Sequence, residues 1–172
     1  MVLGPPPLKL PTLEEQRKYL YQAYCAAQDS VDPSTQNGAV IVGVYDQVVE
    51  ACNTYPDGVI DKPERLERPL KYSYIEHAER NVIYRAAAHG VTTKGATMYV
   101  PWFACADCAR SIIQAKIAIV VGHQQMFDKT PDRWKESIEI ALGMMEEAEI
   151  KTIMYDGPIS PAIRFNGEIW YP

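Results

Sequence analysis

The chain has 172 residues, of which 47% are hydrophobic and 23% charged, values typical of one globular domain with a substantial core. Its formal net charge of -5 argues against extended contact with a nucleic-acid backbone, which favours clustered lysine and arginine. No stretch approaches the roughly 20 apolar residues of a membrane-spanning helix, and the N-terminus lacks the apolar run of a signal peptide. We therefore expect a cytoplasmic protein with neither a membrane nor a polymeric nucleic acid as partner.

Helix and strand signals alternate along the chain. Thr12, with Glu15 three positions later, forms a capping box that starts the first helix, and Gly90 ends the second. Thr130 is expected to cap the last helix, with Pro131 at its first position. Strands are expected at residues 39–44, 47–51, 96–100, 117–121 and 151–155, and helices at 13–28, 76–89, 105–115 and 131–148.

This order of elements predicts an α/β fold, a three-layer α/β/α sandwich with a mixed five-stranded sheet. We divide the chain into a flexible arm (1–11), one domain (12–155) and a tail (156–172) that packs on the domain or on a neighbouring subunit. The tail contains the turn signal Asn166-Gly167, and the long polar connection over residues 53–70 is typical of a functional loop. Core packing is the expected role of an apolar stripe on the last helix, formed by Trp134, Ile138, Ala141, Met145 and Ala148.

Two short motifs carry the chemistry of this sequence. His77-Ala78-Glu79 and Cys105-Ala106-Asp107-Cys108 lie at predicted helix starts, where unpaired N–H groups and a partial positive charge favour thiolate over thiol. His77, Cys105 and Cys108 would supply three ligands to a catalytic zinc ion, whose fourth position stays open for water. This pair of motifs is typical of zinc nucleobase deaminases, in which the glutamate transfers protons and does not bind the metal. Glu79 is therefore the candidate catalytic residue.

Other roles for the cysteine motif remain open at this point. In a non-catalytic, zinc-stabilised binding module a fourth protein ligand would close the site, and His123 or Asp107 is the nearest candidate. A redox Cys-x-x-Cys is a further alternative, which the accompanying His-x-Glu disfavours. The other two cysteines, Cys25 and Cys52, are expected to be buried free thiols in a reducing compartment.

Around these motifs the sequence resembles the cytidine deaminase-like superfamily, and the deoxycytidylate (dCMP) deaminases most closely. The resemblance extends from about Glu14 to Val121. It implies zinc on His77, Cys105 and Cys108, with Glu79 as the proton shuttle. It also implies a homo-oligomer, often a hexamer. The segments that carry the resemblance beside the two motifs are 32–39, 53–56, 71–81 and 95–100.

The same resemblance implies a substrate and its contacts. The implied reaction converts dCMP and water to dUMP and ammonia, with Asn53 holding the sugar or its 3′ hydroxyl and the backbone of Ala78 meeting the base. Trp102 and Phe103 are bulkier than the family's residues just before the cysteines, and they are candidate substrate contacts or core residues. Asp29 stands where family members often carry a basic residue, and an acid facing the pocket would repel a phosphate. The alternative substrate is therefore an unphosphorylated base, a nucleoside or another aminated heterocycle.

Two related deaminase activities fit this sequence less well. A tRNA adenosine deaminase should present a basic surface, which this acidic composition lacks. A riboflavin-pathway deaminase resembles the histidine motif but separates its cysteines more widely.

Overall fold

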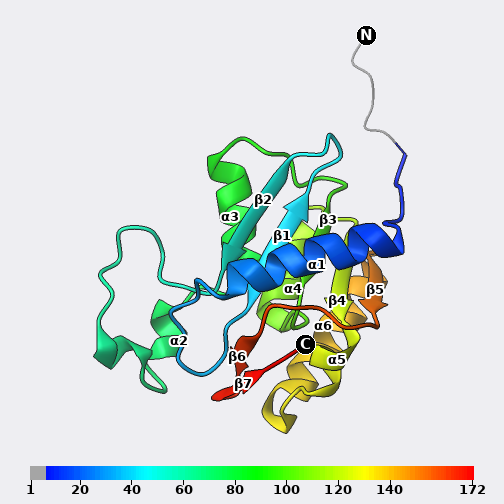
Figure 1. Cartoon of the computed structure of the whole chain (residues 1–172). Coiled ribbons are helices and arrows are strands. Elements are labelled where there is room, and N and C mark those ends of the chain that lie inside the picture. Colours follow the sequence, from blue (N-terminus) through cyan, green and yellow to red (C-terminus); the bar gives the residue numbers. More distant parts are fainter. Residues whose placement is uncertain (1–6) are drawn as a thin grey trace.

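A mixed five-stranded sheet forms the centre of residues 7–172, the part of the chain that the computed structural model describes (Figure 1). The strands lie in the order β2 (Val48–Cys52), β1 (Gly38–Val42), β3 (Thr97–Val100), β4 (Ile119–His123) and β5 (Lys151–Tyr155). β1 is antiparallel to both β2 and β3, whereas β3, β4 and β5 are parallel to one another. The predicted α/β fold with a mixed sheet is confirmed.

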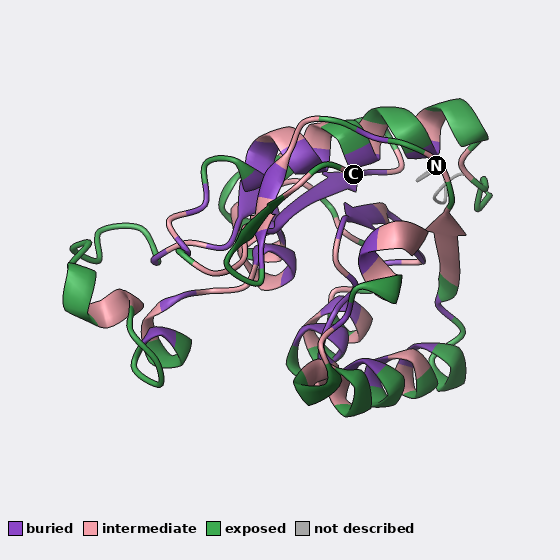
Figure 2. Ribbon diagram, turned by 60° about the horizontal axis from the view of Figure 1, so that its bottom comes forward, coloured by how far each residue is buried: buried purple, intermediate pink, exposed green. Residues whose placement is uncertain are grey.

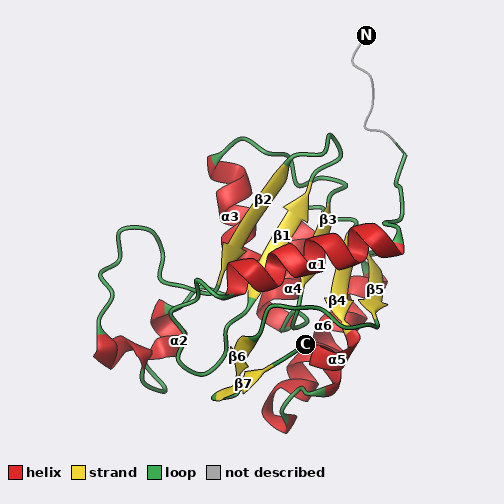
Figure 3. Ribbon diagram, in the orientation of Figure 1, coloured by secondary structure: helices red, strands yellow, loops and turns green. Residues whose placement is uncertain are grey.

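Helices cover both faces of the sheet, as Figures 1 and 3 show. On one face, α1 (Leu13–Ala27) packs Leu20 and Tyr24 against strand residues such as Val40 and Val121. The short α5 (Gln124–Asp128) adds Met126 to this cluster. The other face carries a second apolar cluster, built on α3 (Ala78–Ala88), α4 (Ala106–Gln114) and α6 (Asp132–Glu147). Because both faces are covered, every residue of β4 is buried (Figure 2).

Several element boundaries and types differ from the expectations. β4 begins at Ile119 instead of residue 117, because Lys116 adopts a left-handed backbone conformation (φ 59°) after α4 and the chain extends only two residues later. Pro131, not Thr130, is the N-cap of α6, since the Thr130 hydroxyl accepts a hydrogen bond from the Trp102 indole N–H instead. The pattern also missed α5, and it missed the short helices η1 (Pro63–Leu66) and α2 (Lys71–Tyr74) in and after the polar connection.

The tail folds back onto the domain. β6 (Ile163–Phe165) and β7 (Glu168–Trp170) form a hairpin whose turn is the expected Asn166-Gly167, with both residues at positive φ. Ile163 and Phe165 are buried in the cluster beneath α1. At the other end of the chain, the expected flexible arm includes residues 1–6, which lie outside the described residues. Among residues 7–172, every helix is too short or too polar to cross a bilayer.

One end of the sheet gathers the residues that matter for function. The register pairs Gly38 with Cys52 and Val40 with Tyr99, so the start of β1 and the ends of β2 and β3 meet there. The N-termini of α3 and α4 open beside the same end. The exposed connection between residues 56 and 70 extends away from the body and returns to this edge at α2 (Figures 1 and 2).

Candidate metal centre and substrate pocket

The two helix N-termini bring three metal-ligand side chains together. His77 is the N-cap residue of α3, Cys105 is the N-cap residue of α4, and Cys108 lies in the first turn of α4. The Nδ1 atom of His77 lies 3.7 Å from the Cys105 Sγ and 3.5 Å from the Cys108 Sγ. A tetrahedral site with Zn–S bonds of about 2.3 Å and Zn–N bonds of about 2.0 Å has N···S edges of about 3.5 Å. The donor set and its spacing therefore fit zinc.

No fourth protein ligand joins this group within residues 7–172, where these three residues are the candidate metal-binding cluster. Asp107 is exposed and pairs with Arg110. His123 lies against the α1 face, where it is hydrogen-bonded to the Tyr24 hydroxyl and the Gly157 carbonyl. The geometry therefore favours an open site over a closed one.

Positive groups surround the sulfur atoms. Hydrogen bonding from Cys108 and then from His77 lowers the pKa of Cys105 to about 4, despite its burial. The Arg80 guanidinium donates a 3.6 Å hydrogen bond to the Cys108 Sγ, and Glu76 holds it in place through an ion pair. These contacts favour thiolate, the form that binds a metal, at Cys105. The hydrogen bond that Cys108 makes to Cys105, together with burial, raises the pKa of the Cys108 thiol above its ordinary value, and the Arg80 guanidinium opposes that rise. The other cysteines are free thiols; Cys52 is buried as expected, but Cys25 is partly exposed.

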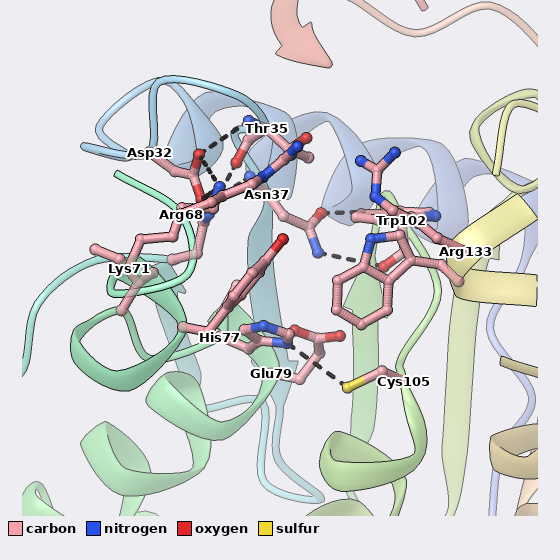
Figure 4. A pocket seen from close by; sticks show the side chains of 15 residues that line it. Asp32, Thr35, Asn37, Arg68, Lys71, His77, Glu79, Trp102, Cys105 and Arg133 are labelled. Carbon is pink, nitrogen blue, oxygen red and sulfur yellow. Dashed lines mark hydrogen bonds and ion pairs between the residues drawn. The ribbon is translucent and has the colours of Figure 1, made fainter. Parts of the chain in front are cut away.

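Glu79 lies beside this group without belonging to it. The residue is only 3% exposed, and burial raises the pKa of its carboxyl above the ordinary value. Figure 4 shows its carboxylate on the same side of a cavity as His77 and Cys105. A buried carboxyl whose pKa is raised toward neutrality can both accept and donate a proton at working pH.

The cavity has an aromatic wall opposite α3. The cavity volume is about 70 Å³, and the cavity opens partly to solvent. The Trp102 and Trp134 rings meet edge to face at 5.8 Å, and the Trp134 ring lies 6.2 Å from the His77 ring. The expectation that Trp134 serves core packing is thus incomplete, since this side chain is half-buried and lines the cavity.

Cationic side chains stand at the rim, away from the candidate metal centre. Lys71 gives all its donors to Asp32 and Ser34, with two 2.9 Å contacts to the Asp32 carboxylate and one to the Ser34 hydroxyl. Arg68 and Arg133 also line the cavity, and neither forms an ion pair within residues 7–172. In Figure 4 both guanidinium groups lie on the side of the cavity away from Glu79. The sequence patterns did not single out either arginine, because a lone exposed arginine carries no periodic signal.

Of the four expected substrate contacts, three line the cavity and one does not. Ala78, Asn53 and Trp102 line the cavity. Both ends of the Asn53 amide bind backbone, with Nδ2 donating to the Thr35 carbonyl and Oδ1 accepting from the Asn37 N–H, so this side chain also shapes the wall. Phe103 is 3% exposed and packs in the core against Phe127 instead of lining the cavity, because the chain turns inward after Trp102.

The sequence could not show whether Asp29 faces the cavity. The residue is exposed at the end of α1, outside the set of side chains that line the cavity. The acid that does line the cavity is Asp32, and its charge is balanced by Lys71. Asp29 therefore does not face the cavity.

Comparison with known proteins shows which family this chain matches. Residues 13–124 match the model of the cytidine and deoxycytidylate deaminase zinc-binding region. An uncharacterized deaminase in the luxG 3′ region of Aliivibrio fischeri is 35% identical over 135 residues, covering 78% of this chain and 89% of that protein. The deoxycytidylate deaminases of mouse and human are 37% and 36% identical over 116 residues. These matches cover 63% of this chain and 64% of each enzyme, less than two thirds of its length.

Solved structures support the fold. The dCMP deaminase of the cyanophage S-TIM5, in complex with dCMP and dUMP, aligns with a TM-score of 0.61 at 16% identity, covering 82% of this chain and 96% of that one. RibD of Acinetobacter baumannii aligns with a TM-score of 0.59 at 22% identity, covering 84% of this chain and 36% of that one.

Proposed function

Because the chain belongs to the cytidine and deoxycytidylate deaminase family of zinc-dependent enzymes, we propose that it deaminates a free pyrimidine nucleotide, converting dCMP and water to dUMP and ammonia. One observation carries this proposal. Within residues 7–172, one cavity has His77 and Cys105 of the His-Cys-Cys group and a buried glutamate at its floor, and two arginines that form no ion pair at its rim. A nucleotide is a molecule with a reactive ring at one end and an anion at the other, which matches this arrangement.

His77, Cys105 and Cys108 are the proposed zinc ligands. Two thiolates and a neutral imidazole balance the charge of the ion, and zinc supplies Lewis acidity that makes water nucleophilic near neutral pH. Arg80 supports this set from outside by its hydrogen bond to the Cys108 sulfur.

Glu79 is the proposed proton shuttle. Its carboxylate accepts one proton of the attacking water and passes it to the ring nitrogen next to the reacting carbon. It then takes the second proton, from the newly added hydroxyl group, and gives it to the departing amine. The new C–O bond replaces the C–N bond, so that ammonia leaves and the ring keeps a carbonyl. Burial supports this role, because it brings the two protonation states of Glu79 closer in energy.

The walls position the rest of the substrate. The half-buried rings of Trp102 and Trp134 would face the base and exclude water, while the Ala78 backbone would meet its edge. Asn53 keeps one N–H and one lone pair beyond its two backbone bonds, which suits a sugar hydroxyl. Arg68 and Arg133 would receive the phosphate, for which planar guanidinium groups are well shaped.

Assembly and location extend the proposal. We expect a cytoplasmic protein that forms a homo-oligomer. Oligomer formation is favoured because the connection and α2, next to the cavity, expose apolar side chains that a second subunit would cover. Val59, Ile60, Leu70 and Tyr72 are 36%, 67%, 44% and 49% exposed, respectively.

A substrate panel tests the proposed function. The zinc-loaded protein is assayed for ammonia release from dCMP, deoxycytidine, dCTP and deoxyadenosine monophosphate. Two solvent-exposed arginine contacts should favour dCMP over deoxycytidine in kcat/KM by about 10- to 100-fold at moderate salt. Equal turnover of the nucleoside would support the unphosphorylated alternative instead. Absence of turnover on every amine would support the non-catalytic zinc module.

A further inference from the structure

The C-terminal hairpin β6–β7 is built into the rim of the cavity, although it lies beyond the residues that match the family model. Its backbone is joined to the loop between α1 and β1 by four hydrogen bonds, one of which, from the Asn166 N–H, reaches the Thr35 hydroxyl. Gln36 N–H donates to the Arg164 carbonyl, Arg164 N–H donates to the Gln36 side chain, and Gly167 N–H donates to the Ser34 carbonyl. That loop supplies Thr35 and other lining residues, so the hairpin and the cavity wall form one unit (Figure 1).

Asn166, in the turn of the hairpin, holds one of the rim arginines. Its Oδ1 accepts a 2.9 Å hydrogen bond from an Arg133 Nη2 donor, and its own N–H donates to the Thr35 hydroxyl at 3.2 Å. Only one of the guanidinium N–H groups is used in this way, so the remaining donors stay available to an anion. The amide of Asn166 is neutral and leaves the positive charge of Arg133 uncompensated.

The neighbouring residue supports the aromatic wall. Phe165 is 7% exposed, and its ring meets the Trp102 ring edge to face at a centroid distance of 5.2 Å. Two consecutive side chains of the hairpin thus contact two different parts of the cavity, Phe165 the wall near the floor and Asn166 the rim.

We propose that the C-terminal hairpin is a specificity element of the active site, in which Asn166 is a positioning residue that orients Arg133 toward the phosphate of the substrate. The inference rests on the proposed nucleotide substrate. Arg133 is exposed, and an unrestrained arginine loses rotamer freedom whenever it binds an anion. A fixed hydrogen bond to Asn166 removes part of that cost before the substrate arrives. The hydrogen bond should therefore strengthen the binding of substrates that carry a phosphate and leave the binding of other substrates unchanged.

Two substitutions at one position separate this role from a purely structural one. Asn166 has φ 52°, which glycine adopts without strain, so Asn166→Gly removes the amide but not the turn. Asn166→Asp keeps the contact and strengthens it, but its carboxylate neutralises Arg133 and repels a phosphate. A structural hydrogen bond would tolerate the aspartate, whereas an anion site would not. Arg133→Gln removes the cation itself, and Arg17→Gln on the outer side of α1 is the charge-matched control.

The measured quantities are kcat and KM for dCMP and deoxycytidine, together with calorimetric binding of dUMP and deoxyuridine, which needs no turnover. We expect Asn166→Gly to raise KM for dCMP by about two- to tenfold with kcat unchanged. Asn166→Asp should raise it at least as much, and Arg133→Gln by about 10- to 100-fold. Deoxycytidine kinetics, and all values for Arg17→Gln, should stay within about twofold of wild type.

Three results would overturn the inference: equal losses on dCMP and deoxycytidine, wild-type selectivity in Asn166→Asp, or unchanged dUMP binding in Arg133→Gln. Failure of the proposed function looks different, because the wild-type protein itself would then release no ammonia from dCMP. In that case the dUMP and deoxyuridine affinities still decide whether Asn166 and Arg133 read a phosphate.

Discussion

Replacing Lys71 by methionine should destabilise the protein by leaving the Asp32 carboxylate buried without a cation. The two side chains are only 6% and 8% exposed, and the ammonium contributes three hydrogen bonds of 2.9 Å. Removing one partner of such a pair costs about 3–5 kcal/mol. Asp32 keeps hydrogen bonds from the N–H groups of Ser34 and Thr35, which places the expected loss near the lower end, about 3 kcal/mol.

Urea unfolding followed by tryptophan fluorescence measures this loss. With a slope of about 1–3 kcal/mol per molar urea, a loss of 3 kcal/mol lowers the midpoint by about 1–3 M. The double variant Lys71→Met/Asp32→Asn should recover part of the stability, because the neutral amide needs no cation. Lys135→Met is the matched control, since its ion pair with Asp132 is exposed to water and its loss should leave the midpoint unchanged. A midpoint for Lys71→Met equal to that of the control would show that the buried Asp32 carboxylate does not need the Lys71 cation.

Two further predictions concern the core beneath α1. Burial lowers the pKa of His123, so the unfolded chain takes up a proton first as pH falls. The contribution of His123 to stability should therefore decrease below about pH 6.5, by at most about 1.4 kcal/mol per pH unit. The difference in unfolding free energy between wild type and His123→Gln, measured by urea titration, should show this slope. Gly38→Ala should cost about 1–3 kcal/mol or more in the same assay, because a Cβ there would lie 2.0 Å from the Ala23 carbonyl oxygen of α1. An unchanged midpoint in Gly38→Ala would show that β1 does not pack directly on α1.

The metal centre and most of the sheet could be predicted from the sequence because their signals are local. His77, Cys105 and Cys108 follow from short motifs at helix starts, and the strands follow from apolar runs bounded by turns. Residue spacing in the first turn of a helix places Cys105 and Cys108 on one face. The sequence motif predicts His77 as the third ligand, but the packing of α3 beside α4 is what brings it to the sulfurs.

The rim of the cavity could not be predicted in this way, because it is assembled from distant segments. Arg68 comes from an irregular connection, Arg133 from the start of α6, and Asn166 from the tail. The helical stripe placed Trp134 correctly on one side of α6 but could not indicate that the stripe ends at a cavity. The orientation of Asp29 depends on where α1 ends, which the sequence does not define to the residue. Its closeness in sequence to Asp32, which does line the cavity, therefore did not indicate where its side chain points.

In the proposed mechanism Glu79 transfers protons beside a zinc ion that His77, Cys105 and Cys108 would hold. The most direct test measures zinc content and ammonia release from dCMP for the wild type and Glu79→Gln in parallel. We expect one zinc per chain in both proteins and a fall in kcat of about 10²–10⁴-fold in the variant, since only the proton carrier is lost. Full activity in Glu79→Gln, or wild-type protein that turns over dCMP equally well without zinc, would contradict the account.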